Sequence, residues 1–118
     1  MDQKKITRGG IYLAKLDPAK AAEVGKIRPV VILNVQAFLN IEPPIIFVCP
    51  LSSHSKPEYQ ALHVRITERD NLQVTSFALI EHCRSISLNR IIYPRLAQLD
   101  TVELNTILHR LQRLVGMP

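Results

Sequence analysis

Short apolar runs rich in β-branched residues recur through most of the chain and are separated by polar or proline-containing stretches. Their lengths, and the turn residues that bound them, predict about six short strands. The predicted strands cover residues 11–16, 30–33, 45–49, 62–66, 76–81 and 90–93. Residues 62–66 alternate apolar and polar positions, so we expect this strand to have one buried and one solvent-facing side.

Prolines mark the limits of two of these runs. Residues 30–33 follow Pro29, and we expect the strand to begin just after that proline. Residues 45–49 are followed directly by Pro50, which predicts that this strand ends there. The close spacing of the strands favours antiparallel pairing.

The pattern changes towards the C-terminus, where apolar residues recur at intervals of three and four. Such spacing predicts a helix with one apolar stripe. The stripe consists of Leu104, Ile107, Leu108, Leu111, Leu114 and Val115. Asp100 and Glu103 have the spacing of a capping box, and Gly116 suits the C-terminal end. Together the two periods predict a mainly β (α+β) fold, in which the C-terminal helix packs against a small, curled antiparallel sheet.

The length of 118 residues suits one domain, residues 1–118. At this size roughly two-thirds of the unfolded surface can be buried, so we expect folding without a disulfide or a metal ion. No apolar run approaches the ~20 residues that span a bilayer, and the charged N-terminus lacks the apolar segment of a secretory signal. We therefore expect a soluble, cytoplasmic protein with no membrane partner. The formal net charge of +5 favours an anionic partner.

Cys49 lies inside an apolar run and Cys83 lies at the end of another. Isolated cysteines in such positions are typical of buried, reduced thiols, and the C-x-x-C spacing of zinc sites is absent. His82 and Cys83 are neighbours, so on a strand they would point to opposite faces and could not bind one metal ion together. The chain also lacks a P-loop, a dinucleotide-binding fingerprint and an H-E-x-x-H motif. We therefore expect no metal and no cofactor.

Arg28 is the most informative charged residue, because it follows a polar loop and stands just before the strand predicted at residues 30–33. At such a position a guanidinium is held in place and remains accessible, and its donors match the geometry of a phosphate. The alternative is an exposed ion pair with Glu23, which would contribute little. Composition alone favours the ion pair.

A polar stretch that contains Ser52, Ser53 and His54 follows the strand predicted at residues 45–49. A Ser beside a His suggests a hydrolase, but no G-x-S-x-G motif surrounds it, and sequence neighbours seldom meet as nucleophile and base. A polar turn is the simpler interpretation. Alternatively, Ser52 and Ser53 donate hydrogen bonds to a phosphate held by Arg28.

His63 falls on the solvent-facing side of its predicted strand, where contact with a ligand and a plain surface role are about equally favoured. Glu81 precedes His82 and Arg84, and nowhere else do an acid, an imidazole and a guanidinium fall so close in sequence. This grouping fits an acid–base cluster and fits a structural ion pair equally well.

Several short motifs, in their order along the chain, resemble those of the MazF/PemK family of toxin endoribonucleases from type II toxin–antitoxin systems. The motifs are Arg8-Gly9-Gly10-Ile11-Tyr12, Leu16-Asp17-Pro18, residues 23–31, Leu51-Ser52 and residues 80–86. The resemblance covers nearly the whole chain, and its most specific part is the spacing of Glu, Gly and Arg-Pro between Glu23 and Pro29. The chain departs from common family residues at Gly10, Ala21, His82 and Ser87. Of these, Ala21 in place of a loop Gly would stiffen the loop and alter substrate preference.

The resemblance implies a small SH3-like β-barrel with helices, a homodimer, and metal-independent cleavage of single-stranded RNA. Arg28 matches the family's catalytic Arg, and Ser52 falls at the position of its catalytic Thr or Ser. Glu23 matches the acid of the active-site loop, and Glu81 falls where some members have an acidic residue proposed as the general base. His63 falls where the family often has a His. The residues we expect to bind RNA are Lys20, Lys26, Ser53, His54, Lys56, His63, His82 and Arg84.

Cleavage without a metal is possible because the 2′-hydroxyl of RNA attacks the adjacent phosphorus and leaves a 2′,3′-cyclic phosphate and a 5′-hydroxyl. The enzyme must remove a proton, protonate the leaving oxygen and stabilise a phosphorane that carries extra negative charge. Arg28 suits charge stabilisation and is also a candidate proton donor, and Ser52 suits the orientation of a phosphate oxygen. The identity of the general base stays open between Glu23, Glu81 and His82.

Two other functions compete with the ribonuclease. A CcdB-like gyrase poison would share the general fold and cleave no RNA, and a non-catalytic family member would only bind RNA or an antitoxin. The Arg28-Pro29 loop disfavours the first, and the presence of Arg28 and Ser52 together disfavours the second. As protein partner we expect a cognate antitoxin whose acidic, disordered segment occupies the basic groove.

Overall fold

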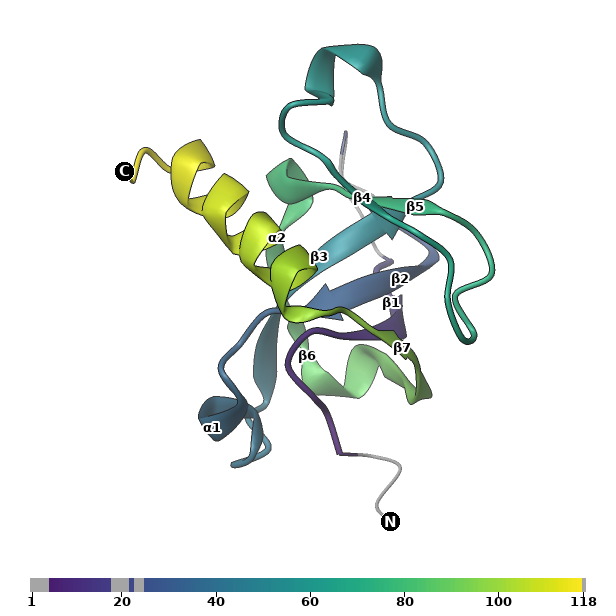
Figure 1. The fold of residues 1–118 in the computed structure, drawn as a ribbon. Helices are drawn as coiled ribbons and strands as arrows, with labels where there is room; N and C mark the ends of the chain where they lie inside the picture. The colour runs from purple at the N-terminus through teal and green to yellow at the C-terminus, as the bar shows by residue number, and fades with distance from the viewer. Residues whose placement is uncertain (1–4, 18–21, 23–24, 118) are drawn as a thin grey trace.

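The computed structural model describes residues 5–17, 22 and 25–117 (Figure 1). The strands in these residues are β1 (Gly10–Lys15), β2 (Ile27–Ile32), β3 (Ile45–Ser52), β4 (Val64–Ile66), β5 (Ser76–Ala78), β6 (Arg84–Ser87) and β7 (Ile91–Gln98). The α-helices are α1 (Gln36–Leu39) and α2 (Thr101–Leu114), and the short 3-10 helices are η1 (Pro57–Tyr59), η2 (Ile80–His82) and η3 (Leu88–Arg90). No helix in this described part of the chain is long and apolar enough to cross a membrane.

The strands form an antiparallel sheet around β3. The strand order is β4-β5-β3-β2-β1-β7, and β6 is an additional partner of β3. The first half of β3 pairs with β6, whereas its last two residues, Leu51 and Ser52, pair with β5. The sheet curls where β3 passes from one partner to the other, and α2 lies across it (Figure 1). This arrangement confirms the predicted mainly β fold with a C-terminal helix on a curled antiparallel sheet.

Two clusters of buried side chains lie on opposite faces of the sheet, because successive strand residues point to opposite sides. In β2, Val31 belongs to one cluster, whereas Val30 and Ile32 belong to the other. Helix α2 covers the first cluster with the fully buried Ile107, and α1 contributes Leu39 to the second. Burial on both faces explains why residues 30–32 of this strand are continuously apolar instead of alternating.

Helix α2 begins where the sequence predicts. The Asp100 carboxylate accepts a hydrogen bond from the Glu103 backbone N–H at 2.7 Å, and the Glu103 carboxylate accepts one from the Asp100 backbone N–H at 3.0 Å. These two bonds complete the predicted capping box. Gly116 follows the helix with a φ of +83°, a conformation that glycine adopts without strain.

The apolar stripe of α2 contacts the core over a shorter length than predicted. Three partly buried leucines pack against the core near Ile107. Leu114 and Val115, at the end of the stripe, are exposed instead. The reason is that the last turn of the helix extends beyond the sheet (Figure 1).

Both prolines that were expected to bound strands lie within them. Strand β2 begins two residues before Pro29, which lies opposite Leu13 of β1. Pairing of β2 with β3 starts only at Val30, so the missing N–H of Pro29 costs the sheet no hydrogen bond. Pro50 lies in β3 opposite Val30, and its carbonyl accepts a hydrogen bond from the Leu79 backbone N–H. The predicted strand limits at these prolines are therefore wrong.

Other boundaries differ because pairing with distant strands decides them. Strand β4 covers only three of residues 62–66, and β7 extends the strand predicted at residues 90–93 to Gln98. Strand β5 ends at Ala78, and η2 then carries Glu81 and His82, so the predicted strand placement of His82 does not apply. The sequence did not predict α1 or β6, because α1 is only four residues long and β6 is stabilised by its pairing with β3.

Candidate functional site

Arg28 lies near the start of β2, where the chain returns from the β1–β2 loop. Hydrogen bonds close the base of this loop: the Lys26 N–H donates to the Asp17 carboxylate at 2.6 Å, and the Leu16 N–H donates to the Lys26 carbonyl at 2.8 Å. Arg28 Nε donates to the Gly25 carbonyl at 3.1 Å. The loop backbone therefore anchors the guanidinium. Two predicted site residues of the same loop, Lys20 and Glu23, lie outside the described residues.

A hollow of about 710 Å³ opens beside Arg28, and we refer to it as the Arg28 hollow. One part of its lining comes from residues 26–29, at the start of β2. The end of β3 contributes Ser52 and Ser53, and residues 71–74, between β4 and β5, complete most of the remaining wall. The hollow thus joins a basic strand end to two hydroxyl groups, which is a combination suited to binding phosphate.

A second hollow, of about 450 Å³, contains Glu81, and we refer to it as the Glu81 hollow. Its lining residues are Ala22, Ser52, His54, Lys56, Tyr59, His63, Leu79, Glu81 and His82. Ser52 lines both hollows, so the two meet at the end of β3. We call the combined surface the Ser52 groove.

The strand pairing explains why Ser52 and Glu81 lie at one site. Ser52 ends β3 opposite Phe77 of β5. Strand β5 leads directly into η2, which carries Glu81 and His82. The His54 backbone N–H donates to Ser52 Oγ at 3.2 Å, so the polar turn predicted after β3 folds back onto this hydroxyl.

The Ser52 groove brings together most of the site residues that the sequence predicts within the described chain. Its lining includes Arg28, Ser52, Glu81, Lys26, Ser53, His54, Lys56, His63 and His82. Arg84 lines neither hollow and lies on β6 opposite Val48. Its Nη1 atom is buried and has no hydrogen-bond partner among the described residues. Closeness in sequence to Glu81 therefore does not bring Arg84 into the groove.

His63 is buried, so the predicted solvent-facing position is wrong. Its Nδ1 atom lies 2.7 Å from Ser55 Oγ, and its Nε2 atom lies 2.9 and 2.8 Å from the two Glu81 carboxylate oxygens. His63 precedes β4, and its backbone N–H donates to the Tyr59 carbonyl at 2.9 Å, which turns it inward. The sequence did not predict Ser55 as a functional residue, because its contact with His63 depends on that turn.

Both cysteines are free thiols, and Cys49 is buried as predicted, whereas Cys83 is half-buried. A hydrogen bond with the Cys83 side chain, together with burial, raises the pKa of Cys49 well above its usual value. The Cys49 thiol is therefore protonated at neutral pH. No group of three or more His, Cys, Asp or Glu side chains in the described ranges is placed to hold a metal ion.

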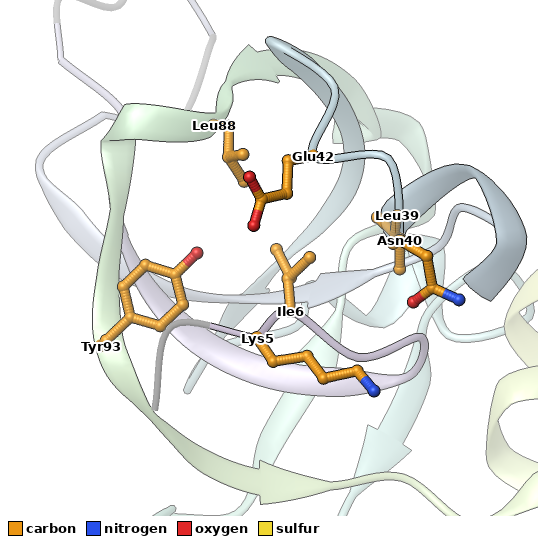
Figure 2. Close-up of a pocket in the computed structure, with 7 residues that line it drawn as sticks. All are labelled: Lys5, Ile6, Leu39, Asn40, Glu42, Leu88 and Tyr93. Carbon is orange, nitrogen blue, oxygen red and sulfur yellow. The ribbon is translucent and has the colours of Figure 1, made fainter. Parts of the chain in front are cut away.

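A third hollow, of about 550 Å³, shares no lining residue with the Ser52 groove. It lies between the N-terminal segment, the end of α1 and the region around η3. Figure 2 shows the Glu42 carboxylate and the Tyr93 hydroxyl pointing into this hollow, whereas the Lys5 ammonium points away. The chemistry-bearing residues predicted from the sequence are absent from its lining, so it is not part of the candidate site.

The chain is similar in sequence to known toxins. A family model described as the PemK-like, MazF-like toxin of type II toxin–antitoxin system matches residues 7–115. The endoribonuclease MazF of Staphylococcus saprophyticus is 33% identical over 87 residues, which cover 73% of this chain and 72% of that protein. The enzyme class in this name supports the endoribonuclease predicted from the sequence and does not favour the gyrase poison.

Solved structures show the same fold. The crystal structure of MazF from Deinococcus radiodurans is 25% identical, covers 93% of this chain and 96% of its own, and has a TM-score of 0.78. A MazE–MazF crystal structure from the same organism is 21% identical, covers 94% of this chain and 95% of its own, and has a TM-score of 0.71. Sequence and fold agree, and the chain belongs to the family of PemK-like, MazF-like toxins of type II toxin–antitoxin systems.

Proposed function

We propose that this toxin cleaves single-stranded RNA in the Ser52 groove without a metal ion. The observation that carries the proposal is the position of Ser52 between the two hollows, because Arg28 lines one of them and Glu81 the other. Lys26 and Lys56 add positive charge to the groove, which suits the phosphate backbone of RNA. The name endoribonuclease, carried by both staphylococcal relatives, supports the same activity.

In the proposed reaction the substrate supplies the nucleophile. The 2′-hydroxyl attacks the adjacent phosphorus, so the O2′–P bond forms, the P–O5′ bond breaks, and a 2′,3′-cyclic phosphate and a 5′-hydroxyl remain. Glu81 takes the proton of the 2′-hydroxyl. Arg28 donates hydrogen bonds to the phosphorane oxygens, and Ser52 orients one of them. The departing 5′ oxygen takes up a proton from bulk solvent.

We assign the base to Glu81 because the His63 hydrogen bond holds its carboxylate while 27% of the side chain stays exposed. The other candidates from the sequence were Glu23 and His82. Glu23 lies outside the described residues. His82 lines the Glu81 hollow, where we propose that it contacts RNA.

Incubation with single-stranded RNA in EDTA tests the proposal. We expect fragments with 5′-hydroxyl and 2′,3′-cyclic phosphate ends, mapped by sequencing of the cleaved ends. A duplex of the same sequence should resist, because A-form geometry keeps the 2′-hydroxyl out of line with its leaving oxygen. Loss of cleavage in EDTA would contradict the mechanism, and intact RNA together with gyrase inhibition would favour the CcdB-like alternative.

We also propose that residues 1–118 act as one domain in the cytoplasm. The protein would form a homodimer, and the RNA groove would run along the dimer interface. Val102, Leu114 and Val115 of the α2 region are exposed, and pairing through the sheet and the terminal helix would cover such apolar surface. Light scattering at micromolar concentration should give twice the monomer mass of 13.4 kDa. A protein that stays monomeric would argue against this pairing.

The proposed protein partner is an antitoxin whose acidic, disordered segment occupies the Ser52 groove. The MazE–MazF structure with the same fold supports an antitoxin partner for this toxin. The net charge of +5 attracts carboxylates by the same electrostatics that attract phosphates.

A further inference from the structure

Ser55, His63 and Glu81 form a continuous chain of hydrogen bonds, in which His63 and Glu81 line the Ser52 groove. Ser55 Oγ lies 2.7 Å from His63 Nδ1, and His63 Nε2 lies 2.9 Å from Glu81 Oε1 and 2.8 Å from Oε2. Because the two oxygens are almost equally distant from one nitrogen, the imidazole faces the middle of the carboxylate. This contact restrains the rotation of the carboxylate as well as its position.

The direction of each hydrogen bond follows from the carboxylate. An ionised carboxylate only accepts hydrogen bonds, so His63 Nε2 carries a hydrogen and donates it to Glu81. When the imidazole is neutral, its Nδ1 atom accepts from the Ser55 hydroxyl. Ser55 therefore favours the tautomer that places a donor against Glu81.

The surroundings of His63 make it a rigid support. Its side chain is 4% exposed, and the Tyr59 ring lies 5.6 Å from the imidazole, centroid to centroid. The backbone N–H donates to the Tyr59 carbonyl, and the His63 carbonyl accepts a hydrogen bond from Arg110 of α2. Because the imidazole is so deeply buried, little of its surface is left for contact with RNA. This differs from the role as an RNA-binding residue that the sequence predicts for His63.

We propose that His63 and Ser55 are positioning residues that hold the Glu81 carboxylate ready to take the 2′-hydroxyl proton. The inference rests on the proposed function, since it concerns the general base of that reaction. A base works well only when its oxygen lies within hydrogen-bond reach of the proton it removes. Glu81 lies on a short 3-10 turn with a partly exposed side chain, so the carboxylate would sample several rotamers without the support of His63.

Steady-state cleavage of a single-stranded RNA oligonucleotide tests the positioning role. His63→Leu removes the donor, and we expect kcat to fall by about 10²-fold with KM little changed, since a misplaced catalytic group costs on that order. His63→Gln keeps an amide N–H on a side chain of similar reach and should restore most of kcat. His109→Gln, on the exposed side of α2, is the matched control and should behave as the parent protein.

Ser55→Ala and a double-mutant cycle complete the experiment. Ser55→Ala should lower kcat less than His63→Leu, and Ser55→Thr, which keeps a hydroxyl, should restore it. In a Glu81→Gln background, His63→Leu should cause little further loss of kcat, because the effects of two substitutions that act through one group are not additive. Thermal unfolding of each variant identifies those that remain folded.

Several outcomes would overturn the positioning role. One is a rise in KM with kcat unchanged in His63→Leu, which would make His63 an RNA contact. Another is a folded His63→Gln as inactive as His63→Leu. If His63→Leu does not fold, full kcat in Ser55→Ala decides against the proposal. Failure of the parent protein to cleave RNA would instead overturn the proposed function. The positioning role alone would be overturned if the parent protein is active, Arg28→Ala is inactive and His63→Leu keeps full activity.

Discussion

At the scale of single residues, Arg28 owes its position to its own loop. Its Nε atom is bound to the Gly25 carbonyl, and the hydrogen bond from Lys26 to Asp17 closes the same loop. A guanidinium carries five N–H donors, so one anchoring bond is compatible with binding a phosphate through the others. Anchoring matters because a preorganised donor needs no reorientation when the phosphorane forms.

Arg28→Ala is therefore expected to lower RNA turnover by about 10²–10³-fold, the scale for loss of one transition-state donor. Lys5→Ala removes an exposed positive charge at the third hollow, away from the Ser52 groove, and serves as the control, with turnover close to that of the parent protein. Initial rates on a fluorogenic RNA measure both. A folded Arg28→Ala variant with full activity would contradict the role given to Arg28.

Ser52→Ala should have a smaller effect than Arg28→Ala. Ser52 carries no charge, and one hydroxyl hydrogen bond to a charged phosphate oxygen contributes about 1.5–3 kcal/mol, or roughly 10- to 10²-fold in rate. The same initial-rate assay compares the two variants. A loss as large as that of Arg28→Ala would mean that Ser52 does more than orient a phosphate oxygen.

At the scale of elements, two long-range connections hold the site and its supporting helix. Strand β3 changes partner from β6 to β5 along its length, which places Ser52 beside the turn that carries Glu81. Helix α2 is tied to the β4–β5 connection by Arg69, which donates hydrogen bonds to both Glu103 oxygens at 2.5 and 2.6 Å. Since Glu103 also belongs to the capping box, one carboxylate joins the start of the helix to the β4–β5 connection.

This connection predicts a pH dependence of stability. The Arg69 hydrogen bonds lower the pKa of Glu103 below its usual value of 4.5. A carboxyl whose pKa is lower in the folded state stabilises the fold above its unfolded pKa, and that stabilisation is lost as pH falls through the folded value. The free energy of unfolding should therefore decline as the solution is acidified below about pH 4.5.

Glu103→Gln tests this dependence, because glutamine can still take part in the capping box but carries no charge. At neutral pH it should lower the free energy of unfolding by about 1 kcal/mol, and part of the decline in acid should disappear. Urea unfolding at several pH values measures both effects. Glu58→Gln, on the exposed η1 turn, is the control, and equal acid sensitivity of Glu103→Gln and the parent protein would refute the contribution of Glu103.

At the scale of the whole molecule, the net positive charge and the Ser52 groove both suit the same two proposed partners, single-stranded RNA and an acidic antitoxin segment. RNA and an acidic antitoxin segment both carry dense negative charge, and the proposed occupancy of one groove makes their binding mutually exclusive. The net charge of +5 speeds the encounter with either partner, but side chains in the groove decide which ligand remains bound.

An acidic antitoxin peptide is accordingly expected to inhibit RNA cleavage competitively. It should raise the apparent KM and leave kcat unchanged, and added salt should weaken its binding because exposed charges are screened. Cleavage rates over a matrix of peptide and RNA concentrations measure this. A peptide that binds tightly and leaves cleavage uninhibited would contradict shared occupancy.

The sequence alone determined the features that depend on nearby residues. The capping box of α2 joins Asp100 to Glu103, only three positions along the chain, and the apolar stripe follows from the helical repeat. The apolar runs predicted the main strands, and the short motifs, in their order along the chain, indicated the toxin family. The same motifs indicated Arg28, Ser52 and Glu81 as site residues, and the structure places these three around one groove.

Only the tertiary structure decided what those residues face. Pro29 lies inside β2 because pairing with β3 starts one residue later, a register that no local pattern reveals. A period-two pattern likewise predicts two sides of a strand without indicating whether the polar side is covered by other parts of the chain. His63 was placed on that polar side, but it is buried against Ser55 and Glu81. Such contacts join residues that are distant in sequence, so they depend on how strands pair and turns close in three dimensions.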